Sequence, residues 1–225
     1  MAGIDVRSFE HTSLPRYANQ YDAQGNRTQL LLSEGAALEV APFLKPGETP
    51  DVVFITPAYH EFRRAPLRFK GSIVGVSLQG PLRSTDSEQR VVHRPDAAGV
   101  ARRFIRAGWI SFFSEEDTDH PESLARSVVD LRGVAVLTRG YNGATLFDSD
   151  GSQHHWDAIA AEPVDPTGAG DCFASAFLFR LAEAESLASA MQFALAAGAL
   201  AVEGTGPDGV PTRTAIEARM TREAA

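Results

Sequence analysis

Residues 164–171 read Val-Asp-Pro-Thr-Gly-Ala-Gly-Asp and lead directly into an apolar run, Cys-Phe-Ala-Ser-Ala-Phe-Leu, at residues 172–178. Gly168 and Gly170 permit backbone angles that other residues avoid, so this turn can direct several N–H groups toward one point. The run that follows has a helical period, and the free N–H groups and dipole of a helix would add to the same positive region. The stretch therefore predicts an anion site at the head of a helix.

Asp171 puts a carboxylate inside this anion site, where it would repel a bound phosphate. The arrangement suits phosphoryl transfer to an alcohol, which needs N–H donors for the transferred group and a carboxylate that takes the hydroxyl proton. A helix N-terminus favours the ionised carboxylate, so we expect a low pKa for Asp171. The alternative is that residues 168–170 form an ordinary turn and that Asp171 is a favourable charge on the first helical turn.

The composition is that of a globular chain large enough for one α/β domain. It has 225 residues, of which 44% are hydrophobic and 22% are charged. The formal net charge of −8 argues against nucleic-acid binding, which normally uses a basic face. No apolar run reaches the ~18 residues that a membrane span requires. We therefore expect neither a nucleic-acid partner nor a membrane partner.

The single cysteine, Cys172, rules out an internal disulfide and suits a reducing compartment. We expect a cytoplasmic protein in which Cys172 is a small buried core residue. The six histidines are scattered, and the adjacent pair His154 and His155 would point to opposite sides of a strand. No histidine is therefore assigned to a metal site.

The first part of the chain has a β pattern without any helical period. Residues 5–34 contain short β-like pieces at 6–9 and 28–32, with a turn at 22–26. A segment rich in proline and glycine follows. We expect a hairpin or small sheet within residues 1–40, a boundary near residue 40 and an α/β core at residues 41–225.

From residue 50 onward, apolar strands alternate with helices, which is typical of parallel strands joined by helical crossovers. The predicted strands lie at residues 52–56, 72–76, 109–113 and 134–137. The predicted helices run from Asp96 to about 106, from an Asp119 and Glu122 capping box to about 133, from 171 to about 184, from 186 to 202, and onward from about 212. Such sheets bind ligands at the carboxyl ends of their strands, which here are followed by residues 77–80, 114–117 and 138–140.

Two common nucleotide motifs are absent: the P-loop, and the early glycine fingerprint of an NAD(P) dehydrogenase. Residues 165–171 instead resemble the Asp-Thr-x-Gly-Ala-Gly-Asp hallmark of the ribokinase-like (PfkB) family of small-molecule kinases, with proline as the second residue. Residues 137–144 are similar to that family's Thr-x-Gly-x-x-Gly strand end, residues 193–201 to its adenine-side helix, and residues 206–211 to its closing loop. The resemblance implies a ribokinase-like three-layer α/β/α fold with a mostly parallel sheet and a small β lid.

The resemblance also implies roles for individual residues. Asp171 would be the general base, and Gly168, Ala169 and Gly170 would donate N–H groups to the phosphate. The residues expected to bind ATP are Thr138, Gly140, Gly143, Thr167 and Gly198. Asp165 and Thr167 would help to hold a monovalent cation such as K⁺ through backbone or side-chain oxygens.

The family's Asn-x-x-Glu segment, which orders Mg²⁺ near the phosphates, corresponds to Ser114-Glu115-Glu116-Asp117 in this chain, and both ends differ. Asp117 would have a shorter reach and could act on Mg²⁺ through a water molecule. The alternative is an acidic loop on the surface. Residues 75–83 resemble a subgroup that includes inositol kinase-like members, so Gln79 and Arg83 could contact the acceptor or a phosphate; the alternative is that they are surface residues.

The function implied is ATP-dependent transfer of the γ-phosphoryl group to a hydroxyl of a small sugar, polyol or related alcohol. Family members normally have a core strand and a Gly-Gly segment before the lid, whereas this chain begins at the lid. We therefore expect either a shortened version of a longer protein or a short natural form. The alternative function is a non-catalytic nucleotide- or metabolite-binding remnant of a sugar kinase. A lid of this family often pairs with another, which makes a homodimer the expected assembly.

Overall fold

A six-stranded sheet forms the centre of the computed structural model, which describes residues 6, 8, 12–21, 27–38, 49–65 and 69–223. The strand order is β10-β9-β8-β7-β4-β3. The strands are β3 (Val52–Ile55), β4 (Ile73–Ser77), β7 (Ile110–Ser114), β8 (Val134–Thr138), β9 (Ala144–Phe147) and β10 (Gln153–Trp156). The first four are parallel and correspond to the four predicted core strands, whereas the antiparallel β9 and β10 were not predicted.

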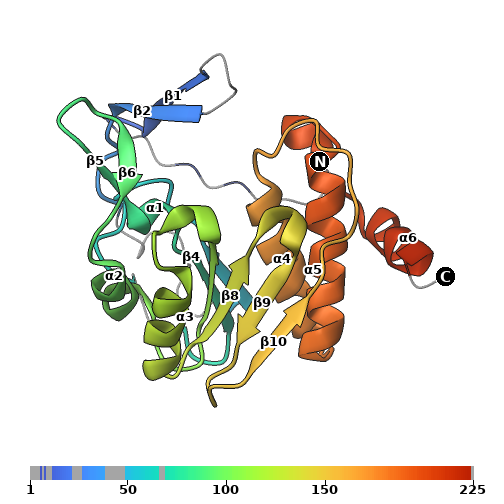
Figure 1. The fold of residues 1–225 in the computed structure, drawn as a ribbon. Coiled ribbons are helices and arrows are strands. Elements are labelled where there is room, and N and C mark those ends of the chain that lie inside the picture. Colours follow the sequence, from blue (N-terminus) through green and yellow to red (C-terminus); the bar gives the residue numbers. More distant parts are fainter. Residues whose placement is uncertain are drawn as a thin grey trace.

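Helices cover both faces of this sheet (Figure 1). One face carries α2 (Ala97–Phe104) and α3 (Pro121–Asp130), and the other carries α4 (Ala169–Ala182) and α5 (Leu187–Val202). Neighbouring residues of β7 serve the two layers, since Phe113 belongs to the core beside α2 and α3, and Phe112 to the core beside α4 and α5. Strands buried on both faces must be apolar throughout, as these are. The predicted three-layer α/β/α fold is confirmed.

One of the two predicted capping signals, Asp96, is found in the structure, and Ser186, predicted as a helix start, also acts as a cap. Asp96 accepts a hydrogen bond from Gly99 N at 2.8 Å at the start of α2, and Ser186 caps α5 through Ser189 N at 3.1 Å. The predicted Asp119 and Glu122 capping box is wrong. Helix α3 begins at Pro121, which has no N–H to satisfy, and Asp119 and Glu122 instead bind side chains from other elements.

Two small antiparallel sheets lie beside the main one (Figure 1). They pair β1 (Arg16–Tyr21) with β2 (Arg27–Ser33), and β5 (Arg83–Thr85) with β6 (Val91–His93). The short helix α1 (Gln79–Leu82) leads from β4 into β5. Leu31 N donates to Gln89 O at 2.9 Å and Leu30 forms a β-bridge with Arg90, so the two small sheets are joined.

The predicted β-like piece at 28–32 lies within β2. Of the predicted piece at 6–9, only Val6 and Ser8 are described, and neither is in a strand. The predicted turn at 22–26 and the boundary near residue 40 lie outside the described residues, so the division at that boundary stays a prediction.

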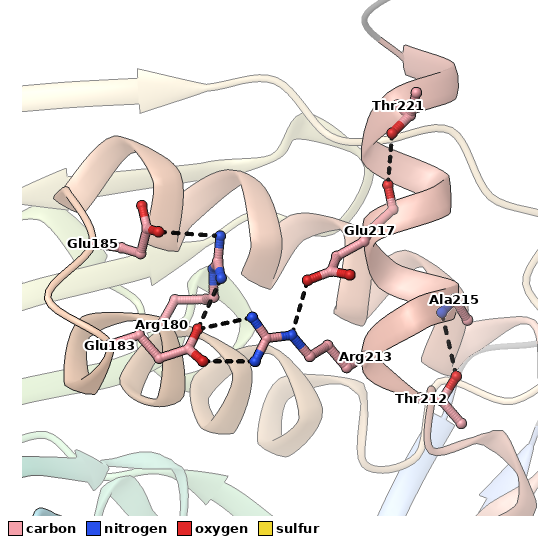
Figure 2. Close-up of polar contacts among 8 residues, drawn as sticks. All are labelled: Arg180, Glu183, Glu185, Thr212, Arg213, Ala215, Glu217 and Thr221. Atoms are coloured by element: carbon pink, nitrogen blue, oxygen red, sulfur yellow. Dashed lines mark hydrogen bonds and ion pairs between the residues drawn. The ribbon is translucent and has the colours of Figure 1, made fainter.

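Helix α6 (Arg213–Glu223) is fastened to the rest of the molecule by ion pairs and by the buried side chain of Ile216. Figure 2 shows the first group of contacts, in which Arg213 reaches Glu183 from α6 while Arg180 reaches it from α4. The shortest distances are 2.6 Å for Arg213 and 2.8 Å for Arg180. At the other end of α6, Arg219 binds Glu203 at 2.6 Å and donates to Ala160 O at 2.9 Å.

Two further predictions concern membrane-spanning helices and the burial of Cys172. No helix among the described residues is long and apolar enough to cross a membrane. Cys172 is only partly buried, so the prediction that it is fully buried in the core was wrong. Its place on the first turn of α4 keeps one side of the residue near the surface.

We expect the substitution Arg219→Gln to lower the free energy of unfolding by about 1–2 kcal/mol, because it leaves the partly buried Glu203 without its charged partner. Arg222→Gln on the same helix replaces an exposed arginine and should change it by less than about 0.5 kcal/mol. Urea unfolding of both variants measures the difference.

The ion pair also predicts a pH dependence. The Arg219 hydrogen bond lowers the pKa of Glu203 in the folded protein. The ion pair therefore adds to the free energy of unfolding above the pKa of an unfolded glutamate. This stabilisation is lost as the pH falls through the lowered pKa of Glu203 in the folded protein. The gap between the parent and Arg219→Gln should shrink in acid, and an equal loss in both arginine variants at neutral pH would contradict the assignment.

Candidate active site

Three segments predicted to bind ligands lie at one edge of the sheet. The parallel register pairs Ser114 at the end of β7 with Thr138 at the end of β8, and Ser77 at the end of β4 with Phe112. Helix α1, the short 3-10 helix η2 (Glu115–Asp117) and the 3-10 helix η3 (Gly140–Asn142) follow these strands. The structure therefore gathers residues 77–80, 114–117 and 138–140 at the carboxyl edge, as predicted.

Helix α4 has its N-terminus directed toward the same edge. Phe173 and Phe177 on α4 pack edge-to-face on Phe112, with ring centroids 6.5 and 5.6 Å away. Further along the helix, Leu178 lies over Gly75 in the middle of β4. Because Phe112 is level with Ser77, the last residue of β4, α4 runs from the carboxyl edge of the sheet toward its amino edge. The anion turn that precedes α4 is thus brought to the edge where β7 and β8 end (Figure 1).

The anion turn, residues 164–170, contains a glycine with left-handed backbone angles at the start of α4. Gly168 has φ of +83° and is the N-cap of α4, a conformation that L side chains rarely adopt. At Gly170 an added Cβ would meet no atom within 4 Å, so the space in front of this residue is open. Of the three predicted donors, the Ala169 N–H is engaged weakly by Pro166 O at 3.3 Å. The first amides of any helix lack helical carbonyl partners, which leaves this end of α4 suited to an anion.

Residues 164 and 165 fix the turn to the end of α5. Val164 N and Asp165 N both donate to Val202 O, at 2.7 and 3.1 Å. Within the turn, Asp165 Oδ1 accepts a hydrogen bond from Thr167 N at 2.9 Å, and the hydrogen bonds from Thr167 lower the pKa of Asp165. Asp165 and Thr167 are therefore neighbours, as the predicted cation site requires. The described residues contain no cluster of three or more acidic, histidine or cysteine side chains that could hold a metal.

Asp171 lies on the first turn of α4, and its side chain reaches solvent. Surrounding protein nevertheless desolvates the carboxyl enough to raise its pKa. The expectation of a low pKa was wrong, because desolvation of the carboxyl raises the pKa of Asp171. Burial likewise raises the pKa of Cys172, and the adjacent Asp171 charge raises it further. A carboxylate with a raised pKa is a stronger base, which suits the acceptance of a proton.

The acidic turn, residues 114–117, follows β7 and is closed by hydrogen bonds that involve its first and last residues. Ser114 N donates to Asp117 Oδ2 at 2.8 Å, and Glu116 N donates to Ser114 Oγ at 3.2 Å. The two hydrogen bonds form a capping box on Ser114 and Asp117, which was not predicted. Burial raises the pKa of Asp117, more than its hydrogen bond from Ser114 lowers it.

Gln79 and Arg83 converge on Asp117. Burial is the main influence on the pKa of Asp117, and both side chains lie close enough to lower that pKa in part. Arg83 donates to Ala58 O at 3.1 Å, and its guanidinium lies 5.1 Å from the ring centre of Tyr17 in lid strand β1. Tyr17 Oη donates to the same Ala58 carbonyl at 2.8 Å. The structure thus joins three predicted residues and adds Tyr17, for which the sequence held no signal.

Arg139 lies within the predicted segment 138–140, but its contacts were not predicted. It follows Thr138 at the end of β8 and binds Glu115 at 3.3 Å and Glu122 at 2.7 Å. The pair with Glu122 lowers the pKa of that glutamate. Arg139 therefore ties the acidic turn to β8 and to the start of α3. A charged residue at the carboxyl end of a buried strand was the available sequence signal.

The three glycines predicted to bind ATP, Gly140, Gly143 and Gly198, lie in different surroundings. Gly140 has φ of +52° with open space at its Cβ position, whereas at Gly143, with φ of +84°, a Cβ would collide with Trp156 O. Gly143 is thus required by the close approach of β10. Gly198 lies in the contact between α4 and α5, opposite Phe173. Thr138 Oγ1 donates to Phe113 O at 3.5 Å, between neighbouring strand ends.

Comparison with known proteins agrees with this architecture. Residues 110–214 match the family described as pfkB family carbohydrate kinase. The chain is 36% identical over 111 residues to the bifunctional protein HldE of Azorhizobium caulinodans, and 47% identical over 61 residues to the ribokinase of Bacillus subtilis. The matched segments cover 49% and 27% of this chain. They span only 23% and 21% of those two relatives.

Two solved structures have the same fold. A pyrophosphate-dependent kinase of the ribokinase family superposes with a TM-score of 0.70 at 20% identity, covering 92% of this chain and 75% of that one. The ribokinase of Arabidopsis thaliana, complexed with ribose and ATP, gives a TM-score of 0.63 at 18% identity, covering 92% of this chain and 69% of that one. The chain therefore has the ribokinase fold, and its residues 110–214 match the pfkB carbohydrate kinase family.

Proposed function

We propose that the protein is an ATP-dependent phosphotransferase that moves the γ-phosphoryl group to a hydroxyl of a small sugar, polyol or related alcohol. The observation that carries the proposal is the position of Asp171, one residue beyond a glycine turn whose amides and helix dipole form an anion site. An acid in that place would be unfavourable for phosphate binding alone. It becomes useful when a hydroxyl must lose a proton beside the phosphate.

The chemistry divides between the turn and the carboxylate. The N–H groups of Gly168, Ala169 and Gly170 would carry the charge of the transferred group in the transition state. Asp171 would accept the proton of the acceptor hydroxyl, and the desolvation that raises its pKa makes it a better base. Because the transition state is loose, this proton transfer can come late.

The donor would lie along the carboxyl edge. Thr138, Gly140 and Gly143 surround the turn after β8, Thr167 lies in the anion turn, and Gly198 lies on α5 behind it. ATP is the proposed donor, in keeping with the ATP bound in the ribokinase of Arabidopsis thaliana. Pyrophosphate is the competing donor, since a pyrophosphate-dependent kinase superposes with a TM-score of 0.70. Parallel assays with both donors decide between them.

Mg²⁺ prefers oxygen ligands, and Asp117 is the carboxylate of the acidic turn that would supply one beside the donor phosphates. Asp117 would hold the ion, directly or through water, and the ion would neutralise charge on the donor phosphates. Asp165 would hold a monovalent cation such as K⁺ near the anion turn, since its lowered pKa keeps it ionised.

The remaining partners follow from the lid side of the site. Gln79 and Arg83 would contact the acceptor, because they lie between the lid residue Tyr17 and the acidic turn. We also propose a homodimer and a cytoplasmic location, the latter in keeping with a single cysteine. A non-catalytic binding protein of the same fold is the alternative, and it predicts ATP or metabolite binding without turnover over a panel of alcohols.

We expect Asp171→Asn to lower kcat by about 10²–10⁴-fold while ATP affinity stays within about threefold, because the variant loses the base but keeps the glycine turn. The control is Asp130→Asn, which removes an exposed carboxylate at the end of α3. Steady-state kinetics and calorimetric ATP binding provide the two measurements. Normal turnover in Asp171→Asn would remove this residue from the role of base.

The same base predicts a pH profile. Asp171 must be ionised to act, so kcat/KM of the parent should fall as the pH drops through its pKa. Because burial raises that pKa, the fall should begin at a higher pH than for an ordinary aspartate. This acid limb should be absent from the residual activity of Asp171→Asn, and its persistence there would assign the limb to another group.

We expect Asp117→Asn to raise the Mg²⁺ concentration that gives half-maximal activity by about tenfold or more. Asparagine retains an oxygen that can accept the Ser114 N–H, so the turn should still close. Glu116→Gln, an exposed neighbour in the same turn, is the matched control. A larger shift in Glu116→Gln than in Asp117→Asn would move the metal role to Glu116.

A further inference from the structure

His93 makes two contacts that the proposed reaction does not use. At the end of β6 its Nδ1 lies 2.8 Å from Asp119 Oδ1, and its Nε2 lies 2.8 Å from the carbonyl oxygen of Glu116. A carboxylate and a carbonyl can only accept hydrogen bonds, so each ring nitrogen faces an acceptor. The ring therefore bridges two points of the segment that follows β7, one inside the acidic turn and one just beyond it.

The backbone of His93 belongs to the β5–β6 hairpin, which we call the lid hairpin because it contacts strand β2 of the predicted lid. His93 pairs with Arg83 in the ladder between β5 and β6. This hairpin is joined to lid strand β2 through the hydrogen bond of Leu31 N to Gln89 O and the β-bridge between Leu30 and Arg90. A continuous series of contacts thus runs from the lid, through β6, to the imidazole ring.

The far side of the acidic turn is held by a different residue. Arg139 at the end of β8 binds the Glu115 side chain, so the core fixes the turn from that direction. His93 approaches from the lid hairpin and holds the backbone at Glu116. The carboxyl of Asp117, the last residue of this turn, lies near Gln79 and Arg83.

We infer that His93 is a positioning residue that fixes the lid hairpin to the acidic turn, so that the acceptor side and the metal side of the site are set together. Any effect of His93 on catalysis rests on the proposed function, whereas its contacts between the hairpin and the acidic turn do not. His93 acts through Glu116 and Asp119 and need not contact a substrate.

The contact between His93 and Asp119 is exposed, so its loss can affect the position of the acidic turn without unfolding the protein. The side chains of His93 and Asp119 are 40% and 75% exposed, so the pair adds little to global stability. Loss of the ring should therefore leave the core folded and release only the two segments that it joins. This is a pattern that a purely structural histidine would not produce.

The first test is hydrogen exchange on the protein without ligands. In His93→Ala, the amides of the acidic turn and of the β5–β6 hairpin should both exchange at least about fivefold faster than in the parent. His154→Ala, an exposed histidine on β10 at the opposite side of the sheet, is the control and should leave both segments unchanged. Faster exchange confined to β6, with residues 114–117 unaffected, would overturn the proposal.

The second test uses kinetics. If the lid hairpin and the acidic turn are coupled, the acceptor KM of the parent should fall as the Mg²⁺–donor complex approaches saturation, because a bound donor would favour the arrangement that binds the acceptor. The ratio of acceptor KM at low and saturating donor should move toward one in His93→Ala, with partial recovery in His93→Gln, whose amide can still donate one hydrogen bond. A ratio equal to that of the parent in His93→Ala would overturn the coupling.

The two tests separate this inference from the proposed function. If the parent transfers phosphate to no alcohol from either donor, the proposed function fails, and hydrogen exchange alone decides whether His93 joins the two segments. If the parent is active and exchange at residues 114–117 is unchanged by His93→Ala, the proposed function stands and the positioning role fails.

Discussion

Direct packing of α4 on the sheet is the constraint on which the site depends. Gly75 lies beneath Leu178, and any side chain at that position in β4 would collide with it. The helix can therefore approach the strands closely and align Phe173 and Phe177 against Phe112. This alignment sets where α4 begins along the strand direction. A helix held further from the sheet would not have its N-terminus fixed so firmly at the carboxyl edge.

Electrostatics then distinguishes the carboxylates gathered at that edge. Asp165 accepts hydrogen bonds within its own turn, and its pKa is lowered. Asp117 and Asp171 are desolvated, and their pKa values are raised. The difference follows from local surroundings, because hydrogen-bond donors stabilise the ionised form and burial opposes it. Carboxylates that are alike in sequence are thereby suited to hold a cation, to order a metal and to accept a proton.

The acidic turn connects the layers of the site. It is closed internally by Ser114 and Asp117, held on the core side by Arg139 and approached from the lid hairpin by His93. Each contact comes from a different strand end or from the small sheet, so the turn takes its position from several elements at once. Sites built on rigid elements and supported in this way keep their geometry better than isolated loops.

The sequence by itself determined the four parallel strands, the α4 and α5 helices and the glycine turn before Asp171. These features depend on local signals: apolar runs, the caps Asp96 and Ser186, and glycines at a helix start. Only the tertiary structure decided the rest. Asp119 and Glu122 have capping-box spacing, yet partners from β6 and β8 bind them instead. The pKa of Asp171 rose against expectation, and Tyr17, His93 and Arg139 joined the site, because contacts between distant segments and burial depend on the packed fold.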